Sequence, residues 1–481
     1  MQNHQWILTG YVRKYVGAAV LVALTMWRST AGSAQARPLN ASSQGPSIAG
    51  DWSAPMLTNG IRVHFVFTLR DSTPEQMVGT VVVPESPSPR APVTVLLRGD
   101  SVIIAGPRGL RFAGVRSAVP DSIIGSVGLG GAMMPTSMVR LQRPQRVTMP
   151  VPYRTRELTV EASDSVRLSA TLSLPAGRGP FPAVVLISGS GPQDRHSTIF
   201  VHEPFALIAD HLARNGIATL RYDERGVGTS TGRYATATVS DLAADAEAVF
   251  RTLRSTPEID KARVGLLGHS EGGIIAPQIA VRSRDVAFLV LLAAPAVRGD
   301  SVSLLQTRAL AASSGYQAYV GSRQDSLNWA LYQALRGATD ATSESAAVER
   351  YVDAILIDVP IAQKPALRAQ LEPQSRGVLQ PEMLSLLRSD AQTTLRQVRV
   401  PVLALFGAKD FQVPAQENHA AMTAAFLAGG NARLDARIVP GLNHLFQPAQ
   451  SGLLNEYFTI TTTMDPAVLA AITAWIAGLK R

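Results

Sequence analysis

The stretch VGLLGHSEGGIIAPQIAV, residues 264–281, joins a short apolar run to a longer one through a glycine-rich turn. Val264–Leu267 predicts a buried strand, and Gly273–Val281 predicts a helix. Between them, Gly268-His-Ser-Glu-Gly272 matches the pattern G-x-S-x-G, in which a serine is exposed on a sharp turn from strand to helix. We therefore expect Ser270 at the edge of a sheet whose strands alternate with helices.

A second match to the same pattern occurs at Gly228-Thr-Ser-Thr-Gly232. Here the serine follows the polar loop Asp223–Gly228 and is followed by more loop, so the strand and helix that the turn requires are missing. Ser270 is therefore the predicted nucleophile. Ser230 is expected to hydrogen-bond the backbone of its own turn.

The strand–helix alternation extends on both sides of Ser270, from about residue 154 to the end of the chain. Near-continuous apolar strands separated by helices are typical of a parallel sheet covered on both faces. The predicted strands are 158–162 and 166–174, which form a leading hairpin, and then 181–187, 217–222, 264–267, 286–293, 400–406 and 433–439. The predicted helices are 206–214, 239–254, 273–281 and 466–479.

Residues 297–395 interrupt this alternation, because no good strand occurs within them. Helical stretches such as Asp325–Leu335 and Ala347–Ile357 fill the segment instead. Ligands of α/β proteins bind at the carboxyl edge of the sheet. We therefore expect a helical lid over that edge.

Residues 46–148 have a different pattern, with seven or eight short strands separated by turns. Ile61–Arg70, for example, alternates apolar and polar residues with period two. Regularly spaced short strands favour a small antiparallel barrel or sandwich. No catalytic constellation is evident in this all-β domain.

The first 36 residues predict a cleaved signal peptide. Arg13 and Lys14 precede the apolar run Tyr15–Trp27, which is too short to span a bilayer comfortably, and Ala34-Gln-Ala36 fits a small-x-small cleavage site. A Pro/Ser/Asn-rich linker comes next. We expect an exported protein, periplasmic or extracellular, whose mature form has no membrane span and consists of the domains 46–148 and 154–481.

Composition excludes several classes of function. The 481 residues contain no cysteine, which removes thiol catalysis, disulfides and cysteine-ligated metals. The formal charge of +9 comes mostly from scattered arginines rather than from Lys/Arg runs, which argues against nucleic acid as a partner. No His/Asp/Glu cluster has metal-ligand spacing, so we expect no metal and no cofactor.

A serine nucleophile needs a base, and the base needs an acid that orients it. His444 follows the predicted strand that ends at Val439, and Asp410 follows the strand that ends at Phe406. The order Ser270, Asp410, His444 is the Ser…Asp…His order of this kind of elbow. His269 is expected only to support its neighbours. Asp353 and Asp358 are poorer candidates for the acid because they lie in the predicted lid.

The oxyanion that forms during attack needs N–H donors. One should be the backbone N–H of Glu271, directly after the nucleophile. The other should come from Ser188-Gly-Ser-Gly-Pro192, the loop after the strand 181–187, and we expect it to be the N–H of Ser190. A phosphate cradle is the competing interpretation of this loop, but the pattern G-x-x-x-x-G-K-[ST] is absent from the sequence.

Five motifs in this order resemble bacterial α/β-hydrolases of the serine aminopeptidase (S33)/lysophospholipase-like group. The resemblance covers about residues 154–481, and the motifs are Ser188–Arg195, Arg221–Ser230, Gly268–Gly273, Gly407–Asp410 and Asn443-His444. It implies the triad Ser270, Asp410 and His444, and a structural Asp223–Gly228 loop in which Arg225 braces the site. The segment beginning Ile48-Ala-Gly-Asp-Trp52 also resembles a strand domain that often precedes such exported hydrolases.

These observations lead to three hypotheses. The leading one is an exported carboxylesterase acting on small or medium acyl esters, since the resemblance implies ester hydrolysis more readily than peptide hydrolysis. The second is an aminopeptidase-type peptidase acting on short peptides, in which Glu349 or Asp353 of the predicted lid anchors the substrate ammonium. In the third, the strand domain is a binding module and the hydrolase part is its scaffold.

Overall fold

The computed structural model describes residues 47–58, 61–73, 76–83, 91–163, 165–313 and 317–479. They form two compact units, one that ends at Pro144 and one that begins at Gln145, and each is described by itself. The predicted signal peptide lies outside the described residues. Within them, every helix is too short or too polar to cross a membrane.

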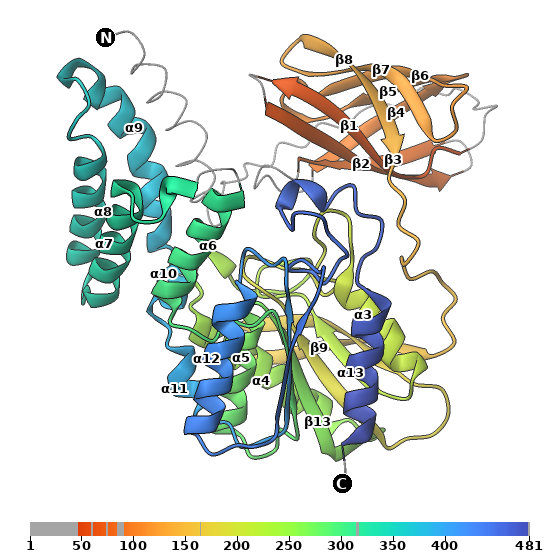
Figure 1. The fold of residues 1–481 in the computed structure, drawn as a ribbon. Helices are drawn as coiled ribbons and strands as arrows, with labels where there is room; N and C mark the ends of the chain where they lie inside the picture. Colours follow the sequence, from red (N-terminus) through yellow and green to blue (C-terminus); the bar gives the residue numbers. More distant parts are fainter. Residues whose placement is uncertain are drawn as a thin grey trace. The chain divides into compact units, whose positions relative to one another are not determined.

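The first unit is a closed antiparallel barrel in which each of eight strands pairs with the next and the last pairs with the first (Figure 1). A barrel rather than a sandwich is therefore the correct form of the predicted all-β fold. Its strands are β1 (Gly50–Thr58), β2 (Ile61–Thr73), β3 (Gln76–Val82), β4 (Ala91–Arg98), β5 (Ser101–Ala105), β6 (Arg111–Arg116), β7 (Ser122–Leu129) and β8 (Ala132–Arg140).

Apolar side chains from alternate strand positions fill the barrel. Trp52, Phe65, Phe67 and Phe112 are at most 2% exposed. The Trp52 indole N–H donates to the carbonyl of Ile48 at 2.8 Å, so its polar edge is satisfied as well. Because the barrel is closed, none of its strands has an unpaired edge. An open sheet would have to protect its edge strands from pairing with other chains.

The second unit is built on an eight-stranded sheet with the order β16-β15-β14-β13-β11-β12-β10-β9. The hairpin β9–β10 and the pair β10–β12 are antiparallel, and the remaining pairs are parallel. The strands are β9 (Arg154–Ser163), β10 (Val166–Leu174), β11 (Phe181–Ile187), β12 (Ala218–Tyr222), β13 (Ile259–His269), β14 (Leu289–Leu292), β15 (Val402–Gly407) and β16 (Leu434–Val439).

Helices cover both faces of this sheet and enclose two apolar cores (Figure 1). Since both faces are covered, β14 and β15 are buried along their whole length, which explains their continuous apolar runs. One face carries α4 (Val239–Ser255), α5 (Gly272–Arg282), α11 (Ala391–Leu395) and α12 (Ala415–Ala428). The other face carries α3 (Pro204–Arg214) and α13 (Pro466–Gly478).

Residues 297–395 form a helical insertion between β14 and β15 (Figure 1). It contains α6 (Gly299–Ser313), α7 (Arg323–Gly337), α8 (Ala341–Ile355), α9 (Lys364–Ser375) and α10 (Pro381–Arg388), and it ends with α11. Leu335, Val348 and Val352 are fully buried in a core of its own. The two predicted helical stretches correspond to α7 and α8.

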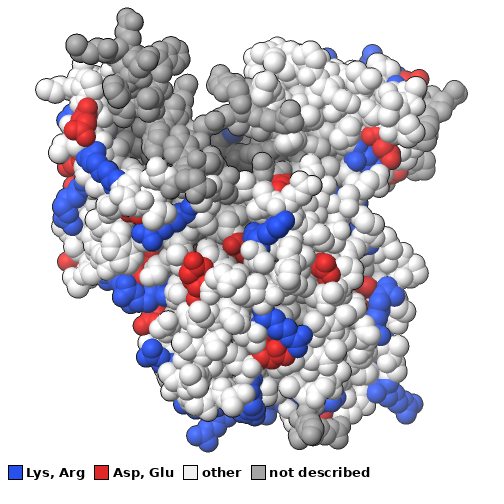
Figure 2. Space-filling view, viewed as in Figure 1, with Lys and Arg blue, Asp and Glu red and all other residues white. Residues whose placement is uncertain are grey.

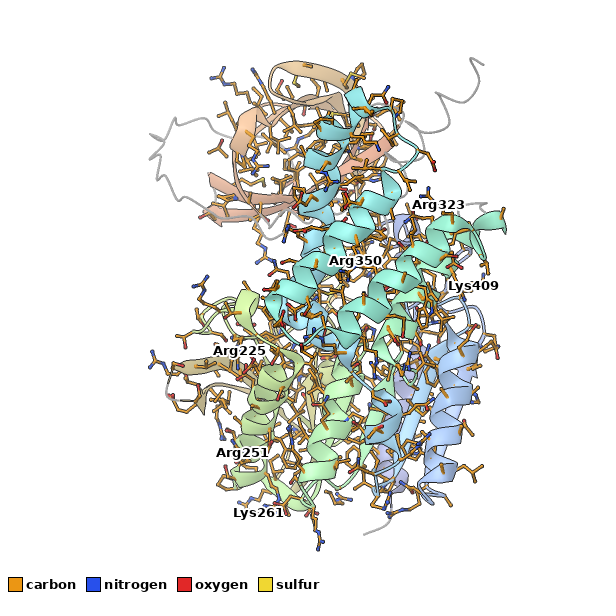
Figure 3. All side chains as sticks on the ribbon, turned by 90° about the vertical axis from the view of Figure 1, so that its left-hand side faces the viewer. Arg225, Arg251, Lys261, Arg323, Arg350 and Lys409 are labelled. Atoms are coloured by element: carbon orange, nitrogen blue, oxygen red, sulfur yellow. The ribbon has the colours of Figure 1, made fainter. Side chains whose placement is uncertain are left out.

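Basic and acidic side chains lie interspersed over the face in view in Figure 2, with no continuous basic stripe across it. Figure 3 labels two of the arginines that pair locally. Arg251 on α4 lies 3.2 Å from Glu247, and Arg323 on α7 lies 3.1 Å from Asp358. Such locally paired charge differs from the basic track that binds a phosphate backbone.

Candidate active site

Ser270 lies on a tight turn between β13 and α5. Its φ is +54°, in the left-handed region that costs a non-glycine residue about 1–3 kcal/mol. Its N–H donates to the carbonyl of Leu292 at 2.9 Å, which ties the turn to β14. A Cβ at Gly268 would lie 2.1 Å from the carbonyl oxygen of Gly272, and one at Gly272 would lie 2.2 Å from that of Ile187. Glycine is therefore required on both sides of the serine.

His444 and Asp410 follow neighbouring parallel strands, β16 and β15, at the carboxyl edge of the sheet. His444 Nδ1 lies 2.7 Å from Asp410 Oδ2, and the two residues are 4% and 6% exposed. Because a carboxylate only accepts, Nδ1 must donate in this bond, and Nε2 is then left without a hydrogen. An imidazole in this tautomer can take a proton from a serine hydroxyl.

The carboxylate of Asp410 and the loop of His444 are both fixed by the backbone around them. Asp410 Oδ1 accepts from the N–H groups of Gln412 at 2.8 Å and Val413 at 2.9 Å. Asn443 Oδ1 accepts from two N–H groups of its own loop, at 3.0 Å each. Lys409, labelled in Figure 3, donates to the carbonyls of Ala449 at 2.6 Å and Gln450 at 2.7 Å. The imidazole therefore has little freedom to turn away.

His269 connects the serine turn to the histidine loop. Its Nε2 lies 3.0 Å from the carbonyl oxygen of His444, and the centroids of the two rings are 4.7 Å apart. Burial, with a smaller contribution from His444, lowers the pKa of His269 to about 3. The ring is therefore neutral and Nε2–H is its donor. The residue directly before Ser270 thus holds His444 in place, which is the supporting role expected of His269.

The two predicted oxyanion donors belong to segments that both lie next to Ser270. Glu271 follows it in the chain, and Ser190 belongs to a loop that passes close by, since a Cβ at Gly189 would lie 3.0 Å from Ser270 Cβ. Among the described residues, neither the Ser190 N–H nor the Glu271 N–H donates to a protein acceptor. Both donors are therefore available to a bound substrate.

The Ser188–Arg195 loop is held by side chains that sequence reasoning did not find. The N–H of Gly191 donates to the Tyr234 hydroxyl at 2.9 Å and to Glu382 Oε1 at 3.3 Å. The N–H of Gln193 donates to Glu224 Oε2 at 2.9 Å. Glu224 lies within the motif Arg221–Ser230. Tyr234 and Glu382 belong to none of the five motifs, and nothing in the sequence around them indicates this role.

The predicted supporting residues, Asp223 and Arg225, brace this region without lying in the turn of Ser270. Asp223 pairs with Arg195 at 2.8 Å, which fastens the end of the Ser188–Arg195 loop. Arg225 pairs with Asp245 of α4 at 2.7 Å, and Figure 3 shows Arg225 labelled beside that helix. Ser230 Oγ donates to the carbonyl of Asp223 at 2.8 Å, within its own turn.

The carboxylates suggested as an ammonium anchor lie on α8 and already have arginine partners. Glu349 pairs with Arg376 at 3.2 Å, and Asp353 pairs with Arg368. Their side chains are 53% and 63% exposed. Across the described part of the chain, no group of three or more His, Asp or Glu side chains could hold a metal ion.

Three comparisons relate the chain to known proteins. Among solved structures it is similar to the Pyrococcus furiosus esterase Pf2001, with 16% identity, 62% of this chain and 89% of that chain covered, and a TM-score of 0.39. It is also similar to hypothetical protein PA2218 from Pseudomonas aeruginosa, with 18% identity, 70% and 99% covered, and a TM-score of 0.42. Among curated proteins it is 33% identical to Esterase EstD of Thermotoga maritima over 169 residues, which span 34% of this chain and 39% of EstD.

A mostly parallel sheet with helices on both faces, and a serine on a strand–turn–helix elbow at its edge, define the second unit as an α/β-hydrolase. Residues 196–361 match the family model described as serine aminopeptidase, S33. Within this segment the chain is similar to that family of hydrolases. The family resemblance and the fold class expected from the sequence are thereby confirmed.

Proposed function

We propose that the protein is a serine hydrolase that cleaves carboxylic esters, with Ser270 as nucleophile, His444 as base and Asp410 as the acid that orients the base. The observation that carries the proposal is the His444–Asp410 hydrogen bond of 2.7 Å on loops adjoining the elbow, with His269 joining the two segments. The kinship with an esterase supports ester substrates.

In the proposed reaction, Ser270 Oγ attacks the ester carbonyl carbon and passes its proton to His444 Nε2. The carbonyl oxygen becomes an oxyanion and accepts hydrogen bonds from the N–H groups of Ser190 and Glu271. The imidazolium, stabilised by Asp410, then gives the proton to the departing alcohol as the C–O bond breaks. Water, activated by the same imidazole, hydrolyses the acyl-enzyme and restores the serine.

Small and medium acyl esters are the proposed substrates, and p-nitrophenyl esters of several chain lengths test this. Ser270→Ala is expected to lower their turnover by on the order of 10⁴–10⁶-fold, because the nucleophile is lost while the fold stays intact. Ser230→Ala is the matched control, since it removes the serine of the other G-x-S-x-G turn. Full activity in Ser270→Ala would disprove the assignment.

An aminopeptidase activity is the alternative, and the same panel with aminoacyl-nitroanilides added distinguishes it. The exposed arginine partners of Glu349 and Asp353 weigh against their role as an ammonium anchor, so we expect faster turnover of esters. Preferential release of nitroaniline would reverse that conclusion.

Export is proposed from the sequence of residues 1–36 alone. The mass of the protein recovered outside the cytoplasm of a producing bacterium should correspond to cleavage after Ala36. A product that retains Arg13 and Lys14 would contradict cleavage.

A further inference from the structure

Glu382, near the start of α10, reaches from the helical insertion to the loop beside the elbow. It is 8% exposed, and its Oε1 accepts from the N–H of Gly191, the residue after the predicted oxyanion donor Ser190. Helix α10 is itself anchored on the hydrolase core, because Ser385 Oγ accepts from the N–H of Val239 at 3.0 Å. Glu382 is therefore part of a contact between the insertion and the predicted oxyanion loop.

The Glu271 side chain lies close enough to the same carboxyl group to be influenced by it. Glu271 is 2% exposed, and neither of its carboxyl oxygens has a hydrogen-bond partner of good geometry among the described residues. Burial, and then the neighbouring Glu382 carboxyl, raise the pKa of Glu271 well above its usual range. Burial and the neighbouring carboxyl group therefore both favour the protonated form of Glu271.

The surroundings of Glu271 add further carboxyl and phenol groups. Glu224 is buried, and burial raises its pKa well above its usual range. The cation in this neighbourhood, Arg225, is already paired with Asp245. The titratable and polar groups that act on Glu271 or on its partners are Glu224, Glu382, Asp245, Arg225, Tyr222, Tyr234 and Ser190.

We propose that Glu382 is a positioning residue for the oxyanion hole. It fastens the helical insertion to the loop of Ser190 through the N–H of Gly191, and it brings its carboxyl group close to that of Glu271, the residue of the other predicted donor. This inference rests on the proposed function, because it concerns the donors that would stabilise the ester oxyanion. It makes the docking of α10 a condition for a complete oxyanion hole.

The position of Glu271 beside Glu382 gives the contact a direction of pH dependence. When Glu271 ionises, its negative charge is repelled by the carboxyl oxygens of Glu382, so we expect α10 or the Ser188–Arg195 loop to move. The donors then leave the positions that the oxyanion requires, which lowers kcat more than it raises KM. A glutamine at position 382 avoids this repulsion, since its amide accepts from the N–H of Gly191 and donates to an ionised Glu271.

The test compares Glu382→Ala, Glu382→Gln and wild type on one p-nitrophenyl ester between neutral and alkaline pH. Glu382→Ala should lower kcat about 10- to 100-fold and change KM by less than about threefold. This decrease in kcat is smaller than the loss of about 10²–10³-fold that follows removal of an oxyanion donor, because the donors stay present but are less well placed. Glu382→Gln should keep kcat within about threefold of wild type at neutral pH and lack the alkaline decline of the wild type. The matched control is Glu372→Ala on α9, whose partner is Arg376. Equal kcat in Glu382→Ala and wild type, or an unchanged alkaline decline in Glu382→Gln, would overturn the proposal.

A second measurement needs no substrate and separates this inference from the proposed function. Hydrogen exchange of the peptide containing Ser188–Arg195 should be faster in Glu382→Ala than in the wild-type chain, and unchanged in Glu372→Ala. If the wild type hydrolyses no ester, the proposed function fails, while the exchange rates still decide whether Glu382 holds the loop. Identical exchange in all three proteins would show that it does not.

Discussion

Replacing Asp410 by asparagine tests the proposed base more sharply than removing the side chain. Asp410 Oδ1 accepts two backbone N–H groups, and Oδ2 accepts from His444 Nδ1 at 2.7 Å. Asparagine keeps the Oδ1 acceptor, so the loop keeps both backbone bonds. Its NH₂ group then faces Nδ1 as a donor, and the imidazole must hold its hydrogen on Nε2 instead.

An imidazole with its hydrogen on Nε2 cannot take the proton of Ser270. In a Ser-His-Asp enzyme, holding the histidine in the wrong tautomer lowers kcat by about 10⁴-fold. At about 1.36 kcal/mol for each factor of ten, this amounts to ~5.4 kcal/mol of transition-state stabilisation. The free energy of unfolding should fall by only ~1.5–3 kcal/mol, the usual contribution of one hydrogen bond to a charged group.

Turnover of a p-nitrophenyl ester at neutral pH, measured beside thermal unfolding, checks both numbers. Asp435→Asn on β16 is the control, since Asp435 pairs with the exposed Arg437 and lies at the start of the strand, at the opposite end from His444. Its turnover should match that of the wild type. If Asp410→Asn stays within tenfold of the wild type while remaining folded, another group orients His444 and the proposed role of Asp410 is wrong.

Three further substitutions test the surroundings of the site. Folding lowers the pKa of His269 from 6.5 to about 3, so the neutral ring contributes fully to stability above pH 6.5, and this contribution, up to ~5 kcal/mol, is lost as the pH drops toward 3. Glutamine at this position keeps a hydrogen-bond donor but does not titrate. Thermal melts of His269→Gln should therefore show a smaller loss of stability in acid than melts of the wild type. Gly272→Ala should destabilise by more than about 3 kcal/mol in calorimetry, since its Cβ would lie 2.2 Å from a carbonyl oxygen, whereas Gly337→Ala meets open space and should not. Arg225→Leu leaves the buried Asp245 unpaired and should cost about 3–5 kcal/mol in urea unfolding, much of which Arg225→Leu combined with Asp245→Leu should restore.

The central strands were the most predictable part of the fold. The apolar run 181–187 coincides with β11, because a strand covered on both faces has no polar positions to blur its limits. β1 was missed, since its residues GDWSAPMLT include a glycine and a proline that normally indicate turns. α12 was also missed. Its apolar residues, largely alanine, lie all around the helix and give no amphipathic period.

The candidate site divides in the same way. Ser270, Asp410 and His444 each come directly after a strand of the parallel sheet. The carboxyl ends of parallel strands meet at one edge, so chain order alone indicates that the three residues lie near one another. Tyr234 and Glu382 come from a 3₁₀ turn and from the helical insertion. Their position depends on how α10 docks, and that docking is a tertiary property with no period or motif in the sequence.

The two neighbours of Ser270 reveal a common electrostatic requirement. Burial lowers the pKa of His269 and raises the pKa of Glu271, so it favours the uncharged form of both side chains. A carboxylate charge close to a developing oxyanion opposes it, because like charges repel more strongly in a buried site than in water. A carboxyl group can therefore follow the nucleophile only if its environment keeps it protonated, and the neighbouring carboxyl of Glu382 supplies part of that environment.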